Sequence, residues 1–272
     1  MRPIILFAGI LLSTVGFSHQ NIVQRLKLPA AESRFYGYKQ FDFMYQQRNC
    51  KVVTPTKPAK GAPWIWRARF WGHEPQTDTT LLGLGYHLVY CDVVELFGNP
   101  EAVQIWNGFY KLMRKGGLAK KVVLEGMSRG GLYVYNWAAE NGNKVACVYA
   151  DAPVLDVRSW PGGLGVGPGS PPMWDSCKRA WNLTTDDDIK NFRGNPLDKV
   201  EKIVKGGYPM LHVCGDADEV VPMSENTDLF EQRIKALGGN ITVIRKPGVK
   251  HHPHSLKDPT PIVQFIKRNY RF

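Results

Sequence analysis

The chain has 272 residues, of which 43% are hydrophobic and 22% are charged. These proportions are ordinary for a globular protein, and the length suits one α/β domain or two small ones. No stretch beyond the N-terminus is long and apolar enough to span a bilayer, so we expect no stable membrane insertion. The formal net charge is +11, but lysine is spread along the chain without a basic arm, which argues against a nucleic-acid partner. The charge suits either an acidic polymer, such as a uronate-rich polysaccharide, or simply a well-solvated surface.

The first residues have the organisation of a secretory signal peptide. Arg2 gives a basic start, and residues 4–12 form an apolar core that is too short to cross a bilayer. Gly16 and Ser18 are the small residues expected before a cleavage site. A buried N-terminal helix is the alternative, although no capping residue supports it. We therefore expect a signal peptide at 1–18, a folded domain at 19–272, and a secreted or periplasmic location.

The first half of the sequence predicts a hairpin followed by alternating strands and helices. Residues 34–53 are expected to form two antiparallel strands with a turn at 47–49, because Phe41, Phe43 and Tyr45 alternate with polar residues. The elements expected next are a loop at 55–63, a strand at 64–66, a helix at 77–84, a strand at 86–94 and a helix at 100–115.

The second half continues the alternation around one long exception. The expected strands are 121–124, 145–150, 210–214 and 241–244, and the expected helices are 132–140, 226–237 and 261–269. Strands that alternate with helices predict an α/β fold with a mostly parallel sheet that is covered on both faces. Residues 156–209 include the glycine- and proline-rich run SWPGGLGVGPGSPP, and an insertion of this length predicts a lid over a site.

The run VVLEGMSRGGLYVY, residues 122–135, places Gly-x-Ser-x-Gly between a predicted strand and a predicted helix. The pattern alone is weak in a chain with 27 glycines, but this setting favours a nucleophile over an ordinary turn serine. Gly126 and Gly130 permit the sharp bend that forces Ser128 out at the top of the sheet. The helix N-terminus behind Ser128 offers free N–H groups to an oxyanion.

Two later segments supply candidates for an acid and a base. MLHVCGDADEVVP ends a predicted strand with three acids, Asp216, Asp218 and Glu219. GVKHHPHSL holds three of the seven histidines, His251, His252 and His254. Taken singly, the aspartates also suit turns and the histidines also suit a metal, although no third ligand to accompany His251 and His254 is evident. Together, in the order serine, acid, histidine, the segments predict a Ser–Asp–His triad without a metal or cofactor.

Five cysteines leave at least one thiol unpaired. Cys91, Cys147 and Cys214 lie in apolar runs and are expected to be small core residues. A Cys50–Cys177 disulfide is compatible with an oxidising compartment, and the sequence leaves it open. There is no Cys-x-x-Cys pair, so zinc is not expected.

These motifs make the chain resemble the α/β-hydrolases, and among them small secreted esterase-like members related to dienelactone hydrolases and prolyl oligopeptidases. The resemblance implies that the acid lies in Gly-x-x-Asp-x-x-Val-Pro, which residues 215–222 match, so Asp218 is favoured. It also implies that the base follows a Pro-Gly-x-x turn, which residues 247–250 match. His251 is therefore the expected base, with His252 as the alternative.

The same resemblance implies an oxyanion hole made of two backbone N–H groups. One belongs to Arg129, which follows the proposed nucleophile. The other is expected in the turn after the strand at 64–66, at Ala68. The elbow GMSRGG also resembles that of glucuronoyl esterases, in which the arginine assists the oxyanion.

Several arginines and tryptophans are candidates for substrate binding. Three arginines are expected to crowd the site, namely Arg67, Arg69 and Arg129, and arginine forks bind carboxylates bidentately. The alternative is that Arg67 or Arg69 only holds loops together by pairing with an acid, namely Glu74, Asp92 or Glu95. The lid tryptophans Trp160, Trp174 and Trp181 suit stacking on sugar rings, although tryptophans also pack cores. We select Arg67 and Trp160 as the expected substrate-binding residues.

The sequence therefore predicts a serine carboxylic ester hydrolase in an α/β-hydrolase domain at 19–272. The expected substrate is a small-molecule or oligosaccharide ester, such as an acetyl, feruloyl or uronoyl ester of a carbohydrate. The alternatives are a peptidase of the prolyl oligopeptidase type and an inactive carbohydrate-binding protein on the same scaffold.

Overall fold

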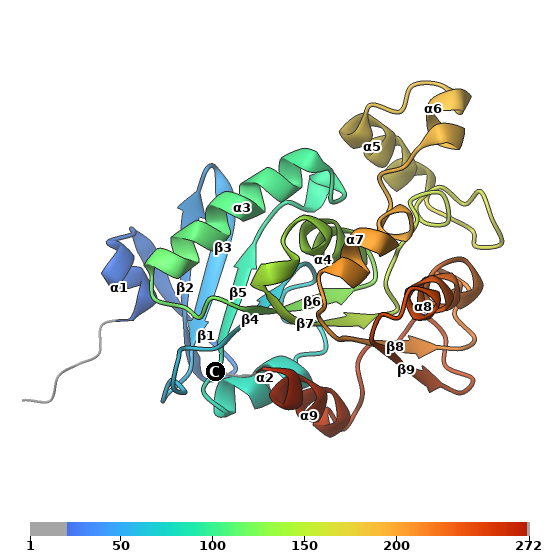
Figure 1. The fold of residues 1–272 in the computed structure, drawn as a ribbon. Helices are drawn as coiled ribbons and strands as arrows, with labels where there is room; N and C mark the ends of the chain where they lie inside the picture. Colours follow the sequence, from blue (N-terminus) through green and yellow to red (C-terminus); the bar gives the residue numbers. More distant parts are fainter. Residues whose placement is uncertain (1–20, 271–272) are drawn as a thin grey trace, which may run out of the picture.

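The computed structural model describes residues 21–270, so the expected signal peptide at 1–18 lies outside the described residues. At its centre is a nine-stranded sheet with the order β1-β2-β3-β5-β4-β6-β7-β8-β9 (Figure 1). The strands are β1 Ala30–Phe35, β2 Tyr38–Tyr45, β3 Arg48–Thr54, β4 Trp64–Arg67, β5 His87–Cys91, β6 Val122–Met127, β7 Val145–Asp151, β8 Met210–Gly215 and β9 Ile241–Lys246. Strands β1, β2, β3 and β5 pair antiparallel in that order, and β5, β4 and β6–β9 pair in parallel. The expected mostly parallel sheet with antiparallel N-terminal strands is confirmed.

The antiparallel edge has one strand more than the sequence predicted. Strand β1 was missed because five of its six residues are exposed, so no alternation of apolar side chains marks it. The predicted hairpin is present as β2 and β3, with Tyr45 opposite Arg48. Its turn consists of Gln46 and Gln47, which both have positive φ, as a two-residue hairpin turn of type I′ requires.

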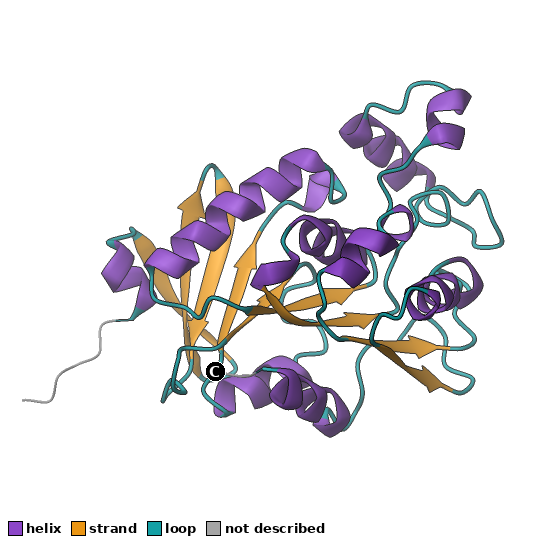
Figure 2. Ribbon diagram, in the orientation of Figure 1, coloured by secondary structure: helices purple, strands orange, loops and turns teal. Residues whose placement is uncertain are grey.

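Helices cover both faces of the sheet (Figure 2). The helices are α1 Ile22–Leu26, α2 Gln76–Gly83, α3 Pro100–Lys115, α4 Gly130–Glu140, α5 Pro171–Trp181, α6 Asp186–Asn191, α7 Val200–Lys205, α8 Thr227–Ala236 and α9 Thr260–Asn269. Helices α3, α4, α7 and α8 lie on one face, and α2 and α9 lie on the other (Figure 1). Each face has its own apolar core, with Trp106 of α3 and Phe230 of α8 in the first and Leu81 of α2 and Ile262 of α9 in the second.

The insertion between β7 and β8 contains α5 and α6, which stand apart from the sheet at one end of the molecule (Figure 1). A third apolar cluster joins this lid to the body, and it includes Phe97, Leu132 and Cys177. The expected lid at 156–209 is longer than the segment that stands apart, because α7 packs with α4 and α8 in the helix layer and buries Ile203 there. The lid proper therefore ends near the start of α7.

All five cysteines are buried and free. Cys50 faces Cys91 across β3 and β5, whereas Cys177 lies in the lid, so the disulfide that the sequence left open does not form in this structure. Within residues 21–270, no helix combines the length and the apolar character that a membrane crossing requires.

Candidate active site

Ser128 lies at a sharp bend between β6 and α4. Its φ is 48°, a conformation that is uncommon for a residue with a side chain and that is expected of a nucleophile elbow. The bend is fixed by its backbone, because the N–H of Ser128 donates to the carbonyl of Asp151 at 2.8 Å and its carbonyl accepts the N–H of Val154 at 2.9 Å. Gly126 is required here, since a Cβ on it would lie 2.8 Å from the carbonyl oxygen of Gly130.

The structure brings Ser128, His251 and Asp218 into one hydrogen-bonded chain. Nε2 of His251 lies 3.0 Å from the Ser128 hydroxyl, and Nδ1 lies 2.7 Å from Oδ2 of Asp218. An ionised carboxylate only accepts, so Nδ1 carries the proton and Nε2 accepts from the serine. All three residues are about 7% exposed. The other oxygen of Asp218 accepts the N–H groups of Val220 and Val221, each at 2.9 Å, which holds the carboxylate in place.

The other acids and histidines of these segments lie elsewhere. Asp216 accepts the N–H of Gly248 at 2.7 Å and so stabilises the turn before the histidines. Glu219 forms an exposed ion pair with Lys250. His252, the alternative base, is exposed and does not bond to Ser128.

His254 forms a second imidazole–carboxylate pair, which the sequence analysis missed. Its Nδ1 lies 2.7 Å from Oδ1 of Asp151, and both residues are at least 96% buried. Oδ2 of Asp151 also accepts the N–H of Ser255 at 2.8 Å and the hydroxyl of Tyr149 at 3.0 Å. Because the Asp151 carbonyl also accepts from Ser128, this aspartate ties the histidine loop to the elbow. Its place at the carboxyl end of a predicted strand was the one sequence signal for it.

A pocket of about 360 Å³ opens above the serine, lined by Phe70, Trp71, His73, Ser128, His251, His252 and His254. Burial lowers the pKa of His73 and of His252, and the neighbouring imidazole of His254 adds to both shifts. The pocket therefore presents aromatic rings and imidazoles to a ligand, and burial disfavours the charged form of His73 and of His252.

Three imidazoles of this pocket lie close enough together to hold a transition metal, namely His251, His252 and His254. Two of them are already engaged, because both nitrogens of His251 and one nitrogen of His254 have partners. A metal on His251 would displace either the serine hydroxyl from Nε2 or the Asp218 carboxylate from Nδ1, so metal binding and the triad geometry are alternatives.

The oxyanion donors differ from the expectation at one position. The N–H of Ala68 donates to the carbonyl of Glu125 at 2.9 Å, so it is unavailable and the assignment of Ala68 was wrong. The next N–H, that of Arg69, has no acceptor within residues 21–270, and neither has that of Arg129. A Cβ on Gly130 would lie 3.9 Å from the Cβ of Arg69, which puts Arg69 against the elbow. Strand β4 ends at Arg67, one residue later in the chain than the sequence suggested, and the turn and its free N–H move with it to Arg69.

Arg67 does not bind substrate, because it is 1% exposed inside the protein. Its guanidinium pairs with Asp78 and, at 3.3 Å, with Glu125, and also donates to three carbonyls of the 69–73 loop. Burial raises the pKa of Glu125 well above its usual range, and the neighbouring Asp78 raises it further. Asp78 Oδ1 and Glu125 Oε2 have no other partner in the described residues, so one proton between the carboxyls satisfies both. Acids near Arg67 were expected from the sequence, but not these two, which lie 11 and 58 residues away along the chain.

Trp160 lies beside the elbow and not in the 360 Å³ pocket. The guanidinium of Arg129 is 5.5 Å from the centroid of its indole. Trp160 packs partly against the lid cluster, as do Trp174 and Trp181. The N–H of the Trp181 indole donates to the carbonyl of Phe97 at 3.3 Å, so this tryptophan fastens the lid to the body.

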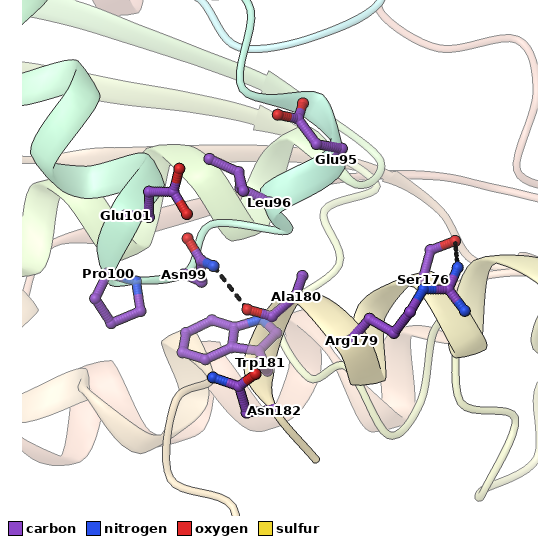
Figure 3. Close-up of a pocket in the computed structure, with 10 residues that line it drawn as sticks. All are labelled: Glu95, Leu96, Asn99, Pro100, Glu101, Ser176, Arg179, Ala180, Trp181 and Asn182. Atoms are coloured by element: carbon purple, nitrogen blue, oxygen red, sulfur yellow. Dashed lines mark hydrogen bonds between the residues drawn. The ribbon is translucent and has the colours of Figure 1, made fainter. Parts of the chain in front are cut away.

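A larger groove lies away from the serine, between the lid and the start of α3 (Figure 3). It encloses about 760 Å³ and includes Trp181, Asn182 and Glu101 in its lining. Figure 3 shows the amide of Asn99 donating to the carbonyl of Ala180 across it, at 2.7 Å. No triad residue lines this groove, so chemistry and not size identifies the smaller pocket as the candidate active site.

The sheet order and the nucleophile elbow define an α/β-hydrolase fold. The sequence model of the prolyl oligopeptidase family matches residues 98–272, and the chain belongs to that family. This places it among the serine hydrolases. No curated protein sequence matches the chain.

Several solved structures share the fold at low sequence identity. The acylaminoacyl peptidase of Pyrococcus horikoshii is 15% identical with a TM-score of 0.64, and the match covers 92% of this chain and 44% of that one. The dipeptidyl peptidase 4 of Porphyromonas gingivalis is 15% identical with a TM-score of 0.63, and the match covers 91% and 37%. An S-formylglutathione hydrolase from Agrobacterium tumefaciens is 16% identical with a TM-score of 0.58, and the match covers 88% and 95%. The chain thus spans less than half the length of the two peptidases and nearly all of the S-formylglutathione hydrolase.

Proposed function

We propose that the protein is a serine carboxylic ester hydrolase in which Ser128, His251 and Asp218 act as the catalytic triad. The observation that carries this proposal is the hydrogen-bonded chain from the elbow serine through the imidazole to a fixed carboxylate. A structural serine needs neither the positive φ nor the buried base.

In this proposal each step is carried out by a named group. Ser128 Oγ attacks the ester carbonyl carbon while its proton passes to Nε2 of His251. Asp218 keeps Nδ1–H in place and stabilises the imidazolium that forms. The N–H groups of Arg129 and Arg69 bind the oxyanion, and His251 then gives its proton to the departing alcohol. Water repeats the sequence on the acyl-enzyme and releases the acid.

An ester on a carbohydrate, such as an acetyl, feruloyl or uronoyl ester, is the substrate class that we propose. The aromatic pocket at 70–73 and the lid tryptophan Trp160 suit a sugar ring, and the net charge of +11 suits an acidic polymer. The location that we propose, secreted or periplasmic, suits such a polymer.

A peptidase is the second candidate, because the chain belongs to the prolyl oligopeptidase family. Among the described residues, the lining of the pocket contains imidazoles and aromatic rings but no carboxylate. It therefore has no group to pair with a free amino terminus, which favours an ester over an aminopeptidase substrate.

A fluorophosphonate probe and a substrate panel test the proposal. We expect the probe to label wild-type protein and S176A, a control on the lid helix, but not S128A. Acetylated, feruloylated or methyl-uronate sugars should be hydrolysed and peptide anilides should not, and S128A or H251A should lower kcat by at least about 10³-fold. Labelling that persists in S128A would refute the triad, and turnover of the anilides alone would favour the peptidase.

A further inference from the structure

Arg129 is a buried cation without a counterion. Arg129 follows the proposed nucleophile in the sequence, and the residue is 8% exposed. Nη1 contacts the sulfur of Met173 at 3.4 Å, and Nε has no hydrogen-bond partner in the described chain. The guanidinium lies 5.2 Å from the ring centroid of Phe97 and 5.5 Å from that of Trp160. Stacking on rings leaves the N–H edge of a guanidinium for a ligand.

Arg69 is a second cation at the same place. Its guanidinium lies 5.0 Å from the ring of Phe70, and its Nε is buried without a partner. Burial lowers the pKa of Arg129, and the charge of Arg69 lowers it further. The two guanidinium groups are therefore close enough to repel each other electrostatically.

No carboxylate within residues 21–270 forms an ion pair with either arginine. Asp156, at the start of the lid, is bound by Arg158, and Asp218 is bound by His251. The contrast with Arg67 is direct, because that buried cation is matched by two acids. A buried charge without a partner is unfavourable. An anion that binds here would therefore be stabilised by a cation that no carboxylate of the described residues already pairs with.

We propose that Arg129 and Arg69 form a subsite that binds a free carboxylate of the substrate, next to the ester that Ser128 attacks. This inference rests on the proposed function and narrows it to esters of sugars that contain a uronic acid. The planar N–H edge of a guanidinium matches the two oxygens of a carboxylate. The indole of Trp160, 5.5 Å from the Arg129 guanidinium, is an aromatic surface of the kind that packs on a sugar ring.

The test compares two substrates that differ only in charge. They are an O-acetylated methyl galacturonoside and the matching O-acetylated methyl galactoside, which has a hydroxymethyl group in place of the carboxylate. Because a hydrogen-bonded charge pair discriminates strongly, we expect wild-type kcat/KM to favour the galacturonoside at least about 10-fold. R129M and R69M should each bring this ratio to within about twofold of one. R158M removes a lid arginine that is already paired with Asp156, and it should leave the ratio unchanged.

Two outcomes would overturn the carboxylate subsite. One is equal kcat/KM of the wild type for both acetates. The other is an equal loss of kcat/KM for both acetates in R129M, which would indicate that the Arg129 side chain stabilises the oxyanion and does not bind the carboxylate. Calorimetry on S128A, which needs no turnover and no arginine variant, should show galacturonate binding at least about 10-fold more tightly than galactose, with the difference shrinking in high salt. Equal binding would also overturn the subsite. Failure of the fluorophosphonate to label Ser128 would overturn the proposed hydrolase function instead. Calorimetry would still show whether the carboxylate subsite exists.

Discussion

Replacing Arg67 with methionine should destabilise the protein strongly, because it leaves two buried acids without their cation. Asp78 and Glu125 are both fully buried, and Arg67 is the cation that pairs with them. Removing one partner of such a network costs about 3–5 kcal/mol. For a domain of this size, that lowers the Tm by roughly 6–20 °C.

Urea denaturation followed by circular dichroism measures this loss, and R245M is the matched control. Arg245 also pairs with two acids, Asp228 and Glu231, but it lies at the surface with 44% of its side chain exposed. Its loss should cost no more than about 1 kcal/mol, since solvent screens such pairs. If R67M and R245M cost the same, the buried network would not stabilise the fold as we argue.

Glu125 gives the network a pH dependence with a definite sign. Its pKa is raised in the folded state, so its contribution to stability is complete below its unfolded value and is lost as pH rises through the folded value. E125Q cannot ionise, and its stability should therefore change less with rising pH than that of the wild type. A steeper alkaline loss in E125Q would contradict a shared proton between Glu125 and Asp78.

Two further predictions concern the elbow and the core. G126A should destabilise the protein by about 2–3 kcal/mol or more in the same urea assay, because its Cβ would lie 2.8 Å from a backbone oxygen. In G130A the new Cβ would meet no atom closer than 3.7 Å, so this variant should be neutral or stabilising by up to about 1 kcal/mol. Equal losses of stability in the two variants would show that steric room for a Cβ is not the reason for glycine at position 126. Burial lowers the pKa of His212 to about 3, so its contribution is complete above its unfolded value near 6.5 and is lost as pH falls toward 3. H212Q should flatten the acid limb of the stability curve, and an unchanged limb would place the lost protons on other groups.

Local patterns in the sequence were enough to predict most of the fold. The helix at 100–115 has the bounds of α3, because Asn99 caps it and Pro100 occupies its first turn. The buried strands were visible as apolar runs, but β1 was not, since its exposed residues carry no periodic signal.

The proximity of Ser128, Asp218 and His251 was predictable because each follows a strand at the same end of a parallel sheet. The environments of the arginines were not. Arg67 ends β4 and Arg69 lies two residues further along the chain, yet Arg67 is matched by acids from distant segments and Arg69 is not. Such pairing depends on which way the chain turns after β4, and no local pattern records that.

The lid is an insertion between β7 and β8, so both of its ends are joined to neighbouring parallel strands. Ser128 precedes this excursion, and Asp218 and His251 follow it. Substitutions or insertions in α5 and α6 can therefore change the surface that this segment presents while the chain positions of Ser128, Asp218 and His251 stay the same. Selection and protein engineering could vary this segment separately from the strand ends that carry the proposed triad.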